Sequence, residues 1–249
     1  MIIRKSKREI DIMSKANSIV AETHEFLSEK IEPGISTYDL DKLAEEFIEN
    51  KGGKPSFKGY RGYPASVCLS INDEVVHGIP SKTRVLEKGM ILSVDIGVYF
   101  KGFHGDAART FPVGKISQEA KSLIEVTRKA LDKGIENAII GNRLTDISNA
   151  VQTHVENAGC SVVRDYVGHG IGTDMHEDPQ IPNFGPAGRG PRLKEGMTLA
   201  IEPMVNIGHY NVKTKDDGWT VVTEDGSLSA HWEDSIAITK EGPKILSRL

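Results

Sequence analysis

Apolar residues recur at helical spacing in four stretches of the chain, and this pattern predicts four amphipathic helices. In the first stretch, Ile10, Met13 and Val20 belong to the apolar face. Thr37 opens the second helix as a hydroxyl residue before a periodic run, and Gly52 ends it. The predicted helices span residues 8–27, 37–51, 119–138 and 145–158.

Shorter stretches rich in β-branched residues predict strands between and after these helices. Each half of the chain therefore has two helices followed by strands, which is an α/β (α+β) arrangement. We expect one curved antiparallel sheet whose outer face is covered by the four helices. The predicted strands span residues 67–71, 91–98, 108–113, 161–167, 198–205, 219–223 and 235–239.

An internal repeat relates the two halves of the chain. The segment EKGMILSVD ends at Asp95 and the segment KEGMTLAIE ends at Glu202, an offset of 202 − 95 = 107. Upstream, the segments that begin at Gly34 and Gly141 keep the same offset, 141 − 34 = 107. We therefore expect a single domain over residues 1–249, built from two pseudo-symmetric halves that meet near residue 115. Acids at matching positions would then meet near the pseudo-twofold axis.

Length and composition fit one globular domain with a full core, since the chain has 249 residues, of which 38% are hydrophobic. The formal net charge of −4 argues against strong binding to nucleic acid. No apolar run is long enough to cross a bilayer, and the N-terminus lacks the apolar segment and cleavage site of a secretory signal. Cys68 and Cys160 are too few for a disulfide framework. These features favour a cytoplasmic protein with reduced thiols.

Acidic and imidazole side chains from both halves predict one dinuclear metal site. Buried carboxylates are very costly unless a cation or a proton lies between them, and the charge of four carboxylates matches two divalent cations. An oxygen-rich ligand set favours divalent Mn, Fe, Co or Zn. Two such ions could share a water and make it acidic enough to act as the nucleophile. The predicted ligands are Asp95, Asp106, His169, Glu202 and Glu233.

Two further histidines, His77 in EVVHGIP and His176 in MHEDPQIP, complete a set of motifs that closely resembles the type I methionine aminopeptidases. The resemblance covers essentially the whole chain. It is to the short bacterial form, which lacks the N-terminal extension of some eukaryotic members and the insertion of type II enzymes. The resemblance implies the pita-bread fold, which agrees with the repeat, and the removal of the initiator methionine before a small second residue.

The resemblance also implies how the ligands divide between the two ions. Asp95 would chelate one ion alone, and Asp106 and Glu233 would bridge both ions. His169 and Glu202 would bind the other ion. Glu202 would in addition accept the proton of the bridging water, so it is expected to be catalytic as well as a ligand.

The same resemblance implies roles for residues that bind the substrate. His77 would contact the scissile amide nitrogen, and His176 would donate a hydrogen bond to the carbonyl oxygen as it becomes negative. A small apolar pocket would receive the methionine side chain, because sulfur packs well against ring edges. The expected lining residues of this pocket are Tyr60, Tyr63, Cys68 and Trp219.

Three positions depart from what bacterial relatives often carry. Arg61 stands where a histidine is common, Met175 where a phenylalanine or leucine is common, and Phe57 in place of a smaller residue. None of them is an expected ligand, so they concern pocket shape and specificity. Asn72 and Ser229 match positions near which relatives can hold a monovalent cation.

Other classes of protein share this fold and are alternatives. A proline-specific peptidase, such as prolidase or aminopeptidase P, usually has an added N-terminal domain for which this chain has no room. A catalytically inactive binding protein, or a metal-independent creatinase-like enzyme, would have lost metal ligands that this sequence keeps. We therefore expect a monomeric, cytoplasmic hydrolase that acts on nascent polypeptides after deformylation and can work near the ribosome. It is expected to bind neither nucleic acid nor membranes.

Overall fold

Four α-helices form where the hydrophobic pattern predicts them in the computed structural model, which describes residues 1–249. Ser6 and Glu9 make a capping box at the start of the first helix, and Ser36 and Ser117 accept backbone hydrogen bonds at the starts of the second and third. None of the helices combines the length and the apolarity that a membrane span needs. The helices are α1 (Lys7–Ser28), α2 (Thr37–Asn50), α3 (Gln118–Glu136) and α4 (Leu144–Asn157).

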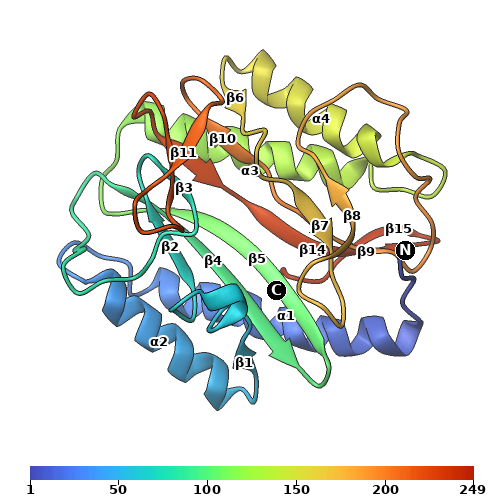
Figure 1. Ribbon diagram of the computed structural model, residues 1–249, viewed down its shortest axis with the longest axis horizontal. Coiled ribbons are helices and arrows are strands. Elements are labelled where there is room, and N and C mark those ends of the chain that lie inside the picture. Colours follow the sequence, from blue (N-terminus) through green and yellow to red (C-terminus); the bar gives the residue numbers. More distant parts are fainter.

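A curved antiparallel sheet of nine strands lies at the centre of the molecule (Figure 1). The strand order is β1-β4-β5-β14-β9-β7-β8, with β2 paired to β4 and β15 paired to β14. Helix α1 packs against β4 and β5, and α3 and α4 pack together over the other half. This arrangement confirms the predicted fold class. The strands are β1 (Lys54–Pro55), β2 (Cys68–Ile71), β4 (Ile91–Phe100), β5 (Phe103–Pro112), β7 (Gly168–Gly170), β8 (Glu177–Ile181), β9 (Thr198–Ile201), β14 (Glu233–Thr239) and β15 (Gly242–Ile245).

Two small three-stranded sheets stand beside the large one, with orders β13-β10-β6 and β11-β12-β3. The prediction that all strands join a single sheet is therefore wrong for these six. The predicted strand 198–205 is split, because Pro203 has no amide N–H to donate to a ladder and the chain passes from β9 into a different sheet. The six strands are β3 (Glu74–Val76), β6 (Ser161–Val162), β10 (Met204–Asn206), β11 (Val212–Thr214), β12 (Val221–Thr223) and β13 (Ser229–His231).

The 107-residue offset of the sequence recurs in the structure. Helices α2 and α4 are each 14 residues long, and their first residues are 144 − 37 = 107 positions apart. An isolated bridge between Ser36 and Val85 has its counterpart between Arg143 and Arg192, at the same offset on both sides. Strands β4 and β9 begin 198 − 91 = 107 positions apart, so they are equivalent elements.

Strand β14 joins the two halves at the middle of the large sheet. It pairs with β5 through Glu233 and Ala108, and with β9 through Asp234 and Ile201. The residues at its start are therefore flanked by one strand from each half. Acids from both halves can therefore meet at the start of β14.

Candidate metal centre and substrate cavity

Asp95 and Asp106 lie on adjacent strands of the β4–β5 hairpin. Asp95 pairs with Ala108 and Asp106 pairs with Gly97, so the two aspartates are diagonal neighbours on the sheet. Both lie within strands of ten residues each, because the hairpin turns only after Phe100. A long, fully paired hairpin therefore holds these two carboxylates.

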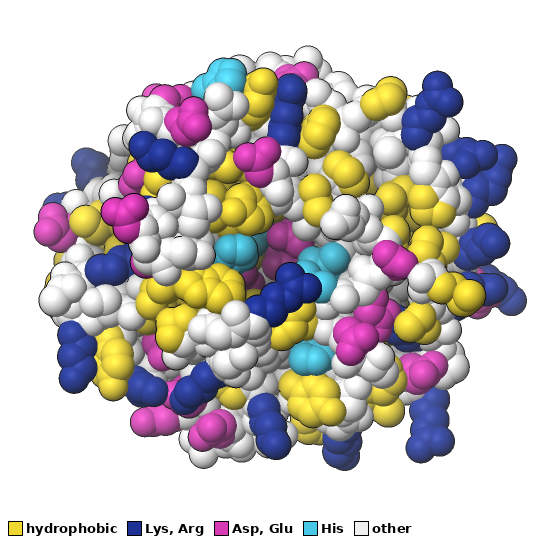
Figure 2. All heavy atoms as spheres, viewed as in Figure 1, with side chains coloured by type: hydrophobic (Ala, Val, Ile, Leu, Met, Phe, Trp, Pro, Cys, Tyr) yellow, Lys and Arg dark blue, Asp and Glu magenta, His cyan; other side chains and the backbone are white.

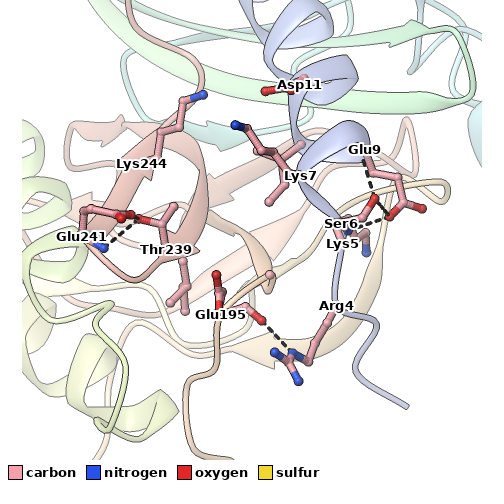
Figure 3. A pocket seen from close by; sticks show the side chains of 13 residues that line it. Arg4, Lys5, Ser6, Lys7, Glu9, Asp11, Glu195, Thr239, Glu241 and Lys244 are labelled. Atoms are coloured by element: carbon pink, nitrogen blue, oxygen red, sulfur yellow. Dashed lines mark hydrogen bonds between the residues drawn. The ribbon is translucent and has the colours of Figure 1, made fainter.

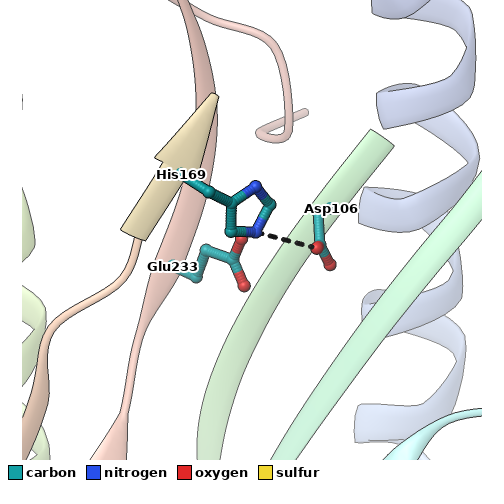
Figure 4. A group of neighbouring side chains, drawn as sticks. All are labelled: Asp106, His169 and Glu233. Carbon is teal, nitrogen blue, oxygen red and sulfur yellow. Dashed lines mark ion pairs between the residues drawn. The ribbon is translucent and has the colours of Figure 1, made fainter. Parts of the chain in front are cut away.

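The other three predicted ligands come from the second half. Glu233 is the first residue of β14, Glu202 directly follows β9, and His169 is the middle residue of β7. His169 Nε2 lies 3.4 Å from Glu202 Oε1 and 3.9 Å from Asp106 Oδ2. Figure 4 shows Asp106, His169 and Glu233 converging from three elements, and their ligand atoms all lie within 4.8 Å of one another.

Burial makes this cluster of carboxylates hold protons tightly. It raises the pKa of Asp95 to about 7, and with mutual repulsion it raises the pKa of Asp106 and Glu233 well above the usual range. Three buried oxygens of the cluster, Asp95 Oδ1, Asp106 Oδ1 and Glu233 Oε1, have no hydrogen-bond partner. Divalent cations would satisfy such oxygens, so the residues present fit a metal centre.

The imidazole of His169 suits a metal ligand. Burial lowers its pKa to about 4, which keeps the ring neutral near pH 7. Its Nδ1 lies 2.9 Å from the Gly170 carbonyl oxygen. That contact places the ring proton on Nδ1 and leaves the lone pair of Nε2 for an ion.

His231 is a member of this cluster that the sequence analysis missed. Its ring is 1% exposed, and its Nε2 has no hydrogen-bond partner and lies 3.7 Å from Glu202 Oε2. Ligand atoms of Glu202, His231 and Glu233 all lie within 4.8 Å of one another. The signal in the sequence was its place two positions before Glu233, where alternate residues of an extended chain share a face.

All eleven predicted site residues line one cavity of about 160 Å³, together with Phe57 and Arg61. In Figure 2, histidine and acidic side chains occupy a hollow near the middle of the visible face, and hydrophobic side chains border it. The cavity joins the acidic cluster to an aromatic region. Its lining comprises Phe57, Tyr60, Arg61, Tyr63, Cys68, His77, Asp95, Asp106, His169, His176, Glu202, Trp219 and Glu233.

Comparison with known proteins identifies the family. A protein-family model described as "Metallopeptidase family M24" matches residues 11–240. The chain belongs to metallopeptidase family M24. A methionine aminopeptidase of Clostridium acetobutylicum is 59% identical over 247 residues, which cover 99% of each chain. Methionine aminopeptidase 1 of Bacillus subtilis is 58% identical over 249 residues and covers all of both chains.

A crystal structure of the methionine aminopeptidase of Thermotoga maritima matches this M24 chain with a TM-score of 0.99 at 47% identity, and the match covers 100% of both chains. The resemblance inferred from the sequence motifs is therefore confirmed, as is the pita-bread fold. Membership of a metallopeptidase family also implies that the protein binds divalent metal ions, and the carboxylate and imidazole cluster could hold them.

In this M24 chain, His176 stands at the mouth of the cavity. The Tyr60 hydroxyl lies 2.9 Å from His176 Nδ1, and the two rings stack with centroids 5.3 Å apart. The His176 ring is also 4.2 Å from the ring of His169, centroid to centroid. Desolvation, His169 and Arg61 lower the pKa of His176 to about 3, so the ring is a neutral hydrogen-bonding group near pH 7.

His77 lines the same cavity and has a strained backbone conformation. Its φ of 61° falls in the left-handed region, which non-glycine residues adopt at a cost and which is common at functional sites. The edges of Tyr166 and Trp219 meet its ring at centroid distances of 5.6 and 6.2 Å. Burial lowers the pKa of His77 to about 4, so this imidazole is also neutral.

The aromatic region of the M24 cavity is rigid and apolar. Tyr63 donates its hydroxyl hydrogen to backbone carbonyls and meets Trp219 edge-on with centroids 5.2 Å apart. Cys68, Phe57 and Met175 are buried in the same cluster. Two of the three unusual residues of the sequence, Phe57 and Met175, therefore shape this pocket, and the third, Arg61, lines its rim.

Asn72 and Ser229 are neighbours, because the Ser229 amide donates to the Asn72 carbonyl oxygen at 2.9 Å. Asn72 has a φ of 56°, again in the left-handed region. The structure thus brings together the two residues that we linked to a monovalent cation.

Proposed function

We propose that this M24 chain is a methionine aminopeptidase that hydrolyses the peptide bond after an N-terminal methionine. One observation carries the proposal: a single cavity joins a cluster of metal-ligand side chains to an apolar, aromatic subsite. The cluster alone would suit many metallohydrolases, whereas the subsite beside it fits a thioether side chain. The full-length relatives that bear this name, at 59% and 58% identity, support the same function.

We infer that two divalent cations are held here, chosen among Mn, Fe, Co and Zn. Asp95 would bind one ion, His169 and Glu202 the other, and Asp106 and Glu233 both. Bound ions would supply an acidified water and polarise the scissile carbonyl group. The buried carboxylate oxygens support this inference, since three of them have no hydrogen-bond partner. A monovalent cation beside Asn72 and Ser229 is a further part of the proposal.

Glu202 is the residue that would take the proton of the attacking water. Its two carboxyl oxygens lie near two imidazole nitrogens, 3.4 Å from His169 and 3.7 Å from His231. Burial and the nearby Asp95 raise the pKa of Glu202 well above its usual value. A carboxylate with a raised pKa is a better general base near neutral pH.

His176 and His77 would act on the two ends of the scissile amide. Because the Tyr60 hydroxyl contacts His176 Nδ1, the Nε2 atom is the one left for the substrate. If Tyr60 donates, Nε2 carries the proton and can hydrogen-bond a carbonyl oxygen that becomes negative. His77 would contact the leaving amide nitrogen.

The substrate class follows from the subsite and from its closeness to the metal cluster. The methionine side chain would lie among Tyr60, Tyr63, Cys68 and Trp219, where its sulfur meets ring edges. The free α-amino group would contact Asp95 and its ion, so a formyl group must be removed first. A bulky second residue would clash at the narrow mouth.

We infer from this chemistry where and on what the enzyme works. Its substrates would be the N-termini of nascent polypeptides after deformylation, which places it in the cytoplasm and near the ribosome. The expected form is a monomer that binds neither nucleic acid nor membranes directly.

A peptide panel tests the proposal. With Mn²⁺, Fe²⁺ or Co²⁺ supplied under reducing, anaerobic conditions, Met-Ala-Ser should be cleaved faster than Leu-Ala-Ser by a finite factor, because similar apolar groups differ by only about 1–3 kcal/mol in such pockets. Lys-Ala-Ser and formyl-Met-Ala-Ser should not be cleaved. Faster cleavage of Xaa-Pro peptides that lack methionine would instead identify a proline-specific peptidase. No cleavage of any peptide would favour an inactive binding protein.

A further inference from the structure

The N-terminal arm, residues 1–5, is tied to the second half of the molecule. Lys5 donates its backbone N–H to the Gly196 carbonyl oxygen at 2.6 Å. Arg4 donates from Nε to the Glu195 carbonyl oxygen, also at 2.6 Å (Figure 3). These bonds hold the arm against the residues just before β9, which are distant from it in the sequence.

Lys5 differs from the other lysines in this region. Figure 3 shows Lys5, Lys7 and Lys244 around an open cavity of about 760 Å³. Lys7 and Lys244 are exposed, whereas Lys5 Nζ forms an ion pair with Glu177 in which the two side chains are only 3% and 4% exposed. Desolvation offsets most of the attraction in a buried ion pair, so such pairs are weak evidence for stability. The presence of this ion pair is therefore better explained by the position in which it holds the surrounding residues than by a gain in stability.

The turn between β7 and β8 packs directly on this ion pair. Glu177 also accepts hydrogen bonds from Thr173 Oγ1 and from the Asp174 backbone N–H, each at 3.4 Å. A Cβ atom on Gly172 would lie 2.3 Å from Lys5 Cε and 2.4 Å from Glu177 Oε1, so a side chain at this position would displace the ends of the two paired side chains. The carboxylate of Glu177 is therefore the centre of the turn, and Lys5 supplies its counter-charge.

His176 is the residue of this turn that faces the cavity, and it directly precedes Glu177. Glu177 is paired in the β7–β8 ladder with Gly170, next to His169. We propose that Lys5 and Glu177 are positioning residues that hold His176 at the cavity, a role that rests on the proposed aminopeptidase function. Without the charge of Lys5, the Glu177 carboxylate would be buried without a cation and the turn would rearrange around it.

The variant Lys5→Met tests this, since it keeps most of the apolar stem and removes the charge. We expect kcat on Met-Ala-Ser to fall by about 10²-fold, because small displacements of a catalytic group have effects of this size. KM and bound metal equivalents should stay near the wild-type values. If Lys5 acts through His176, the double variant Lys5→Met/His176→Ala should be no slower than His176→Ala alone. Wild-type kcat in Lys5→Met, or losses that multiply in the double variant, would overturn the proposal.

A matched control separates positioning from general stability. Val151→Ala creates a cavity in the core under α3 and α4, away from the arm, and should lower the melting temperature while kcat is retained. Hydrogen exchange over residues 172–177 gives a readout that needs no substrate. It should be faster in Lys5→Met and unchanged in Val151→Ala, and equal exchange in Lys5→Met and the wild type would contradict the proposal. If the wild type cleaved no methionyl peptide, the proposed function would fail while the exchange experiment still tested the turn.

Discussion

Asp95 and Glu202 occupy equivalent positions of the repeat, yet their surroundings differ. Strand β4 runs through Asp95 and is paired with β5 over its full ten residues. Strand β9 has four residues and ends just before Glu202, where Pro203 sends the chain into another sheet. The carboxylate of the first half is therefore held by a continuous hairpin, and that of the second half lies where a strand ends.

This difference shows how the two copies of a duplicated unit can place equivalent carboxylates in different surroundings, one suited to binding an ion and one suited also to exchanging a proton. No imidazole contacts Asp95 in the hairpin, which suits a fixed ligand. Glu202 has an imidazole near each carboxyl oxygen, His169 from β7 and His231 from β13. The small sheet that Pro203 makes possible brings β13 to this place, because β10 pairs with β13. The broken strand thus gives the second half a carboxylate that can bind an ion and exchange a proton.

The largest effect should come from a residue that we propose binds both ions. Asp106→Ala would remove this bridging ligand, and we expect loss of at least one metal equivalent and nearly all turnover with the fold retained. Elemental analysis, circular dichroism and cleavage of Met-Ala-Ser measure these outcomes. Asp11→Ala, exposed on α1 and outside this cavity, is the control and should keep both metal and rate. Full activity of Asp106→Ala under metal-limited conditions would rule out the dinuclear assignment.

His77→Ala and His176→Ala should separate catalysis from metal binding. Each should lower kcat by about 10²–10⁴-fold, as expected for a lost proton donor or oxyanion contact. Bound metal should stay at the wild-type level in both. A large drop in metal content of either variant would mean that a ligand has been mistaken for a catalytic group.

His231→Leu tests what is special to the second half. Loss of a group that orients a metal ligand typically weakens metal affinity by about 10–100-fold, and we expect the lower end of that range. His231→Gln keeps a hydrogen-bond donor and should remain close to the wild type. Calorimetric titration with Mn²⁺ measures the affinity. Equal Mn²⁺ affinity in His231→Leu and the wild type would show that His231 of β13 does not contribute to metal binding by Glu202.

The smallest effect concerns the metal-free protein. Burial lowers the pKa of several histidines, among them His169 and His176, so their contribution to stability rises with pH until the unfolded histidines are neutral. The variant Asp95→Asn shares this contribution and is therefore the reference. Burial raises the pKa of Asp95 to about 7, whereas the same carboxyl in the unfolded chain has already lost its proton. The stability linked to this proton is therefore lost as the pH rises through 7.

Thermal unfolding of the metal-free protein should accordingly show that the melting temperature of the wild type, measured relative to that of Asp95→Asn, falls as the pH rises from about 6 to about 8. Saturating Mn²⁺ should abolish this relative fall. A relative melting temperature that rises over this range without metal would contradict the role of the Asp95 proton in this pH dependence.

Much of the fold was predictable because its causes are local. The helices have apolar faces, three of the four begin at a serine cap, and their predicted ends agree with the structure to within two residues. The repeat also identified the equivalence of Asp95 and Glu202 from spacing alone. The strand break was missed because Pro203 interrupts a run of apolar residues that otherwise predicts one strand.

Long-range contacts account for what the sequence did not reveal. His231 approaches Glu202 only because β13 pairs with β10, and no periodicity encodes that pairing. Lys5 and Glu177 are 172 positions apart, so nothing in either neighbourhood predicts their ion pair. The roles of the predicted ligands and pocket residues stay predictions, which the variants above test.

The buried thiol of Cys68 bears on covalent chemistry at this site. Burial and the carboxylates of Asp95 and Asp106 raise its pKa well above the usual value. Since the thiolate is the form that attacks electrophiles, this sulfur should be inert to alkylating reagents near neutral pH. Cys160, which is only partly buried, should be labelled first. An irreversible inhibitor of this pocket would therefore need a different residue to react with.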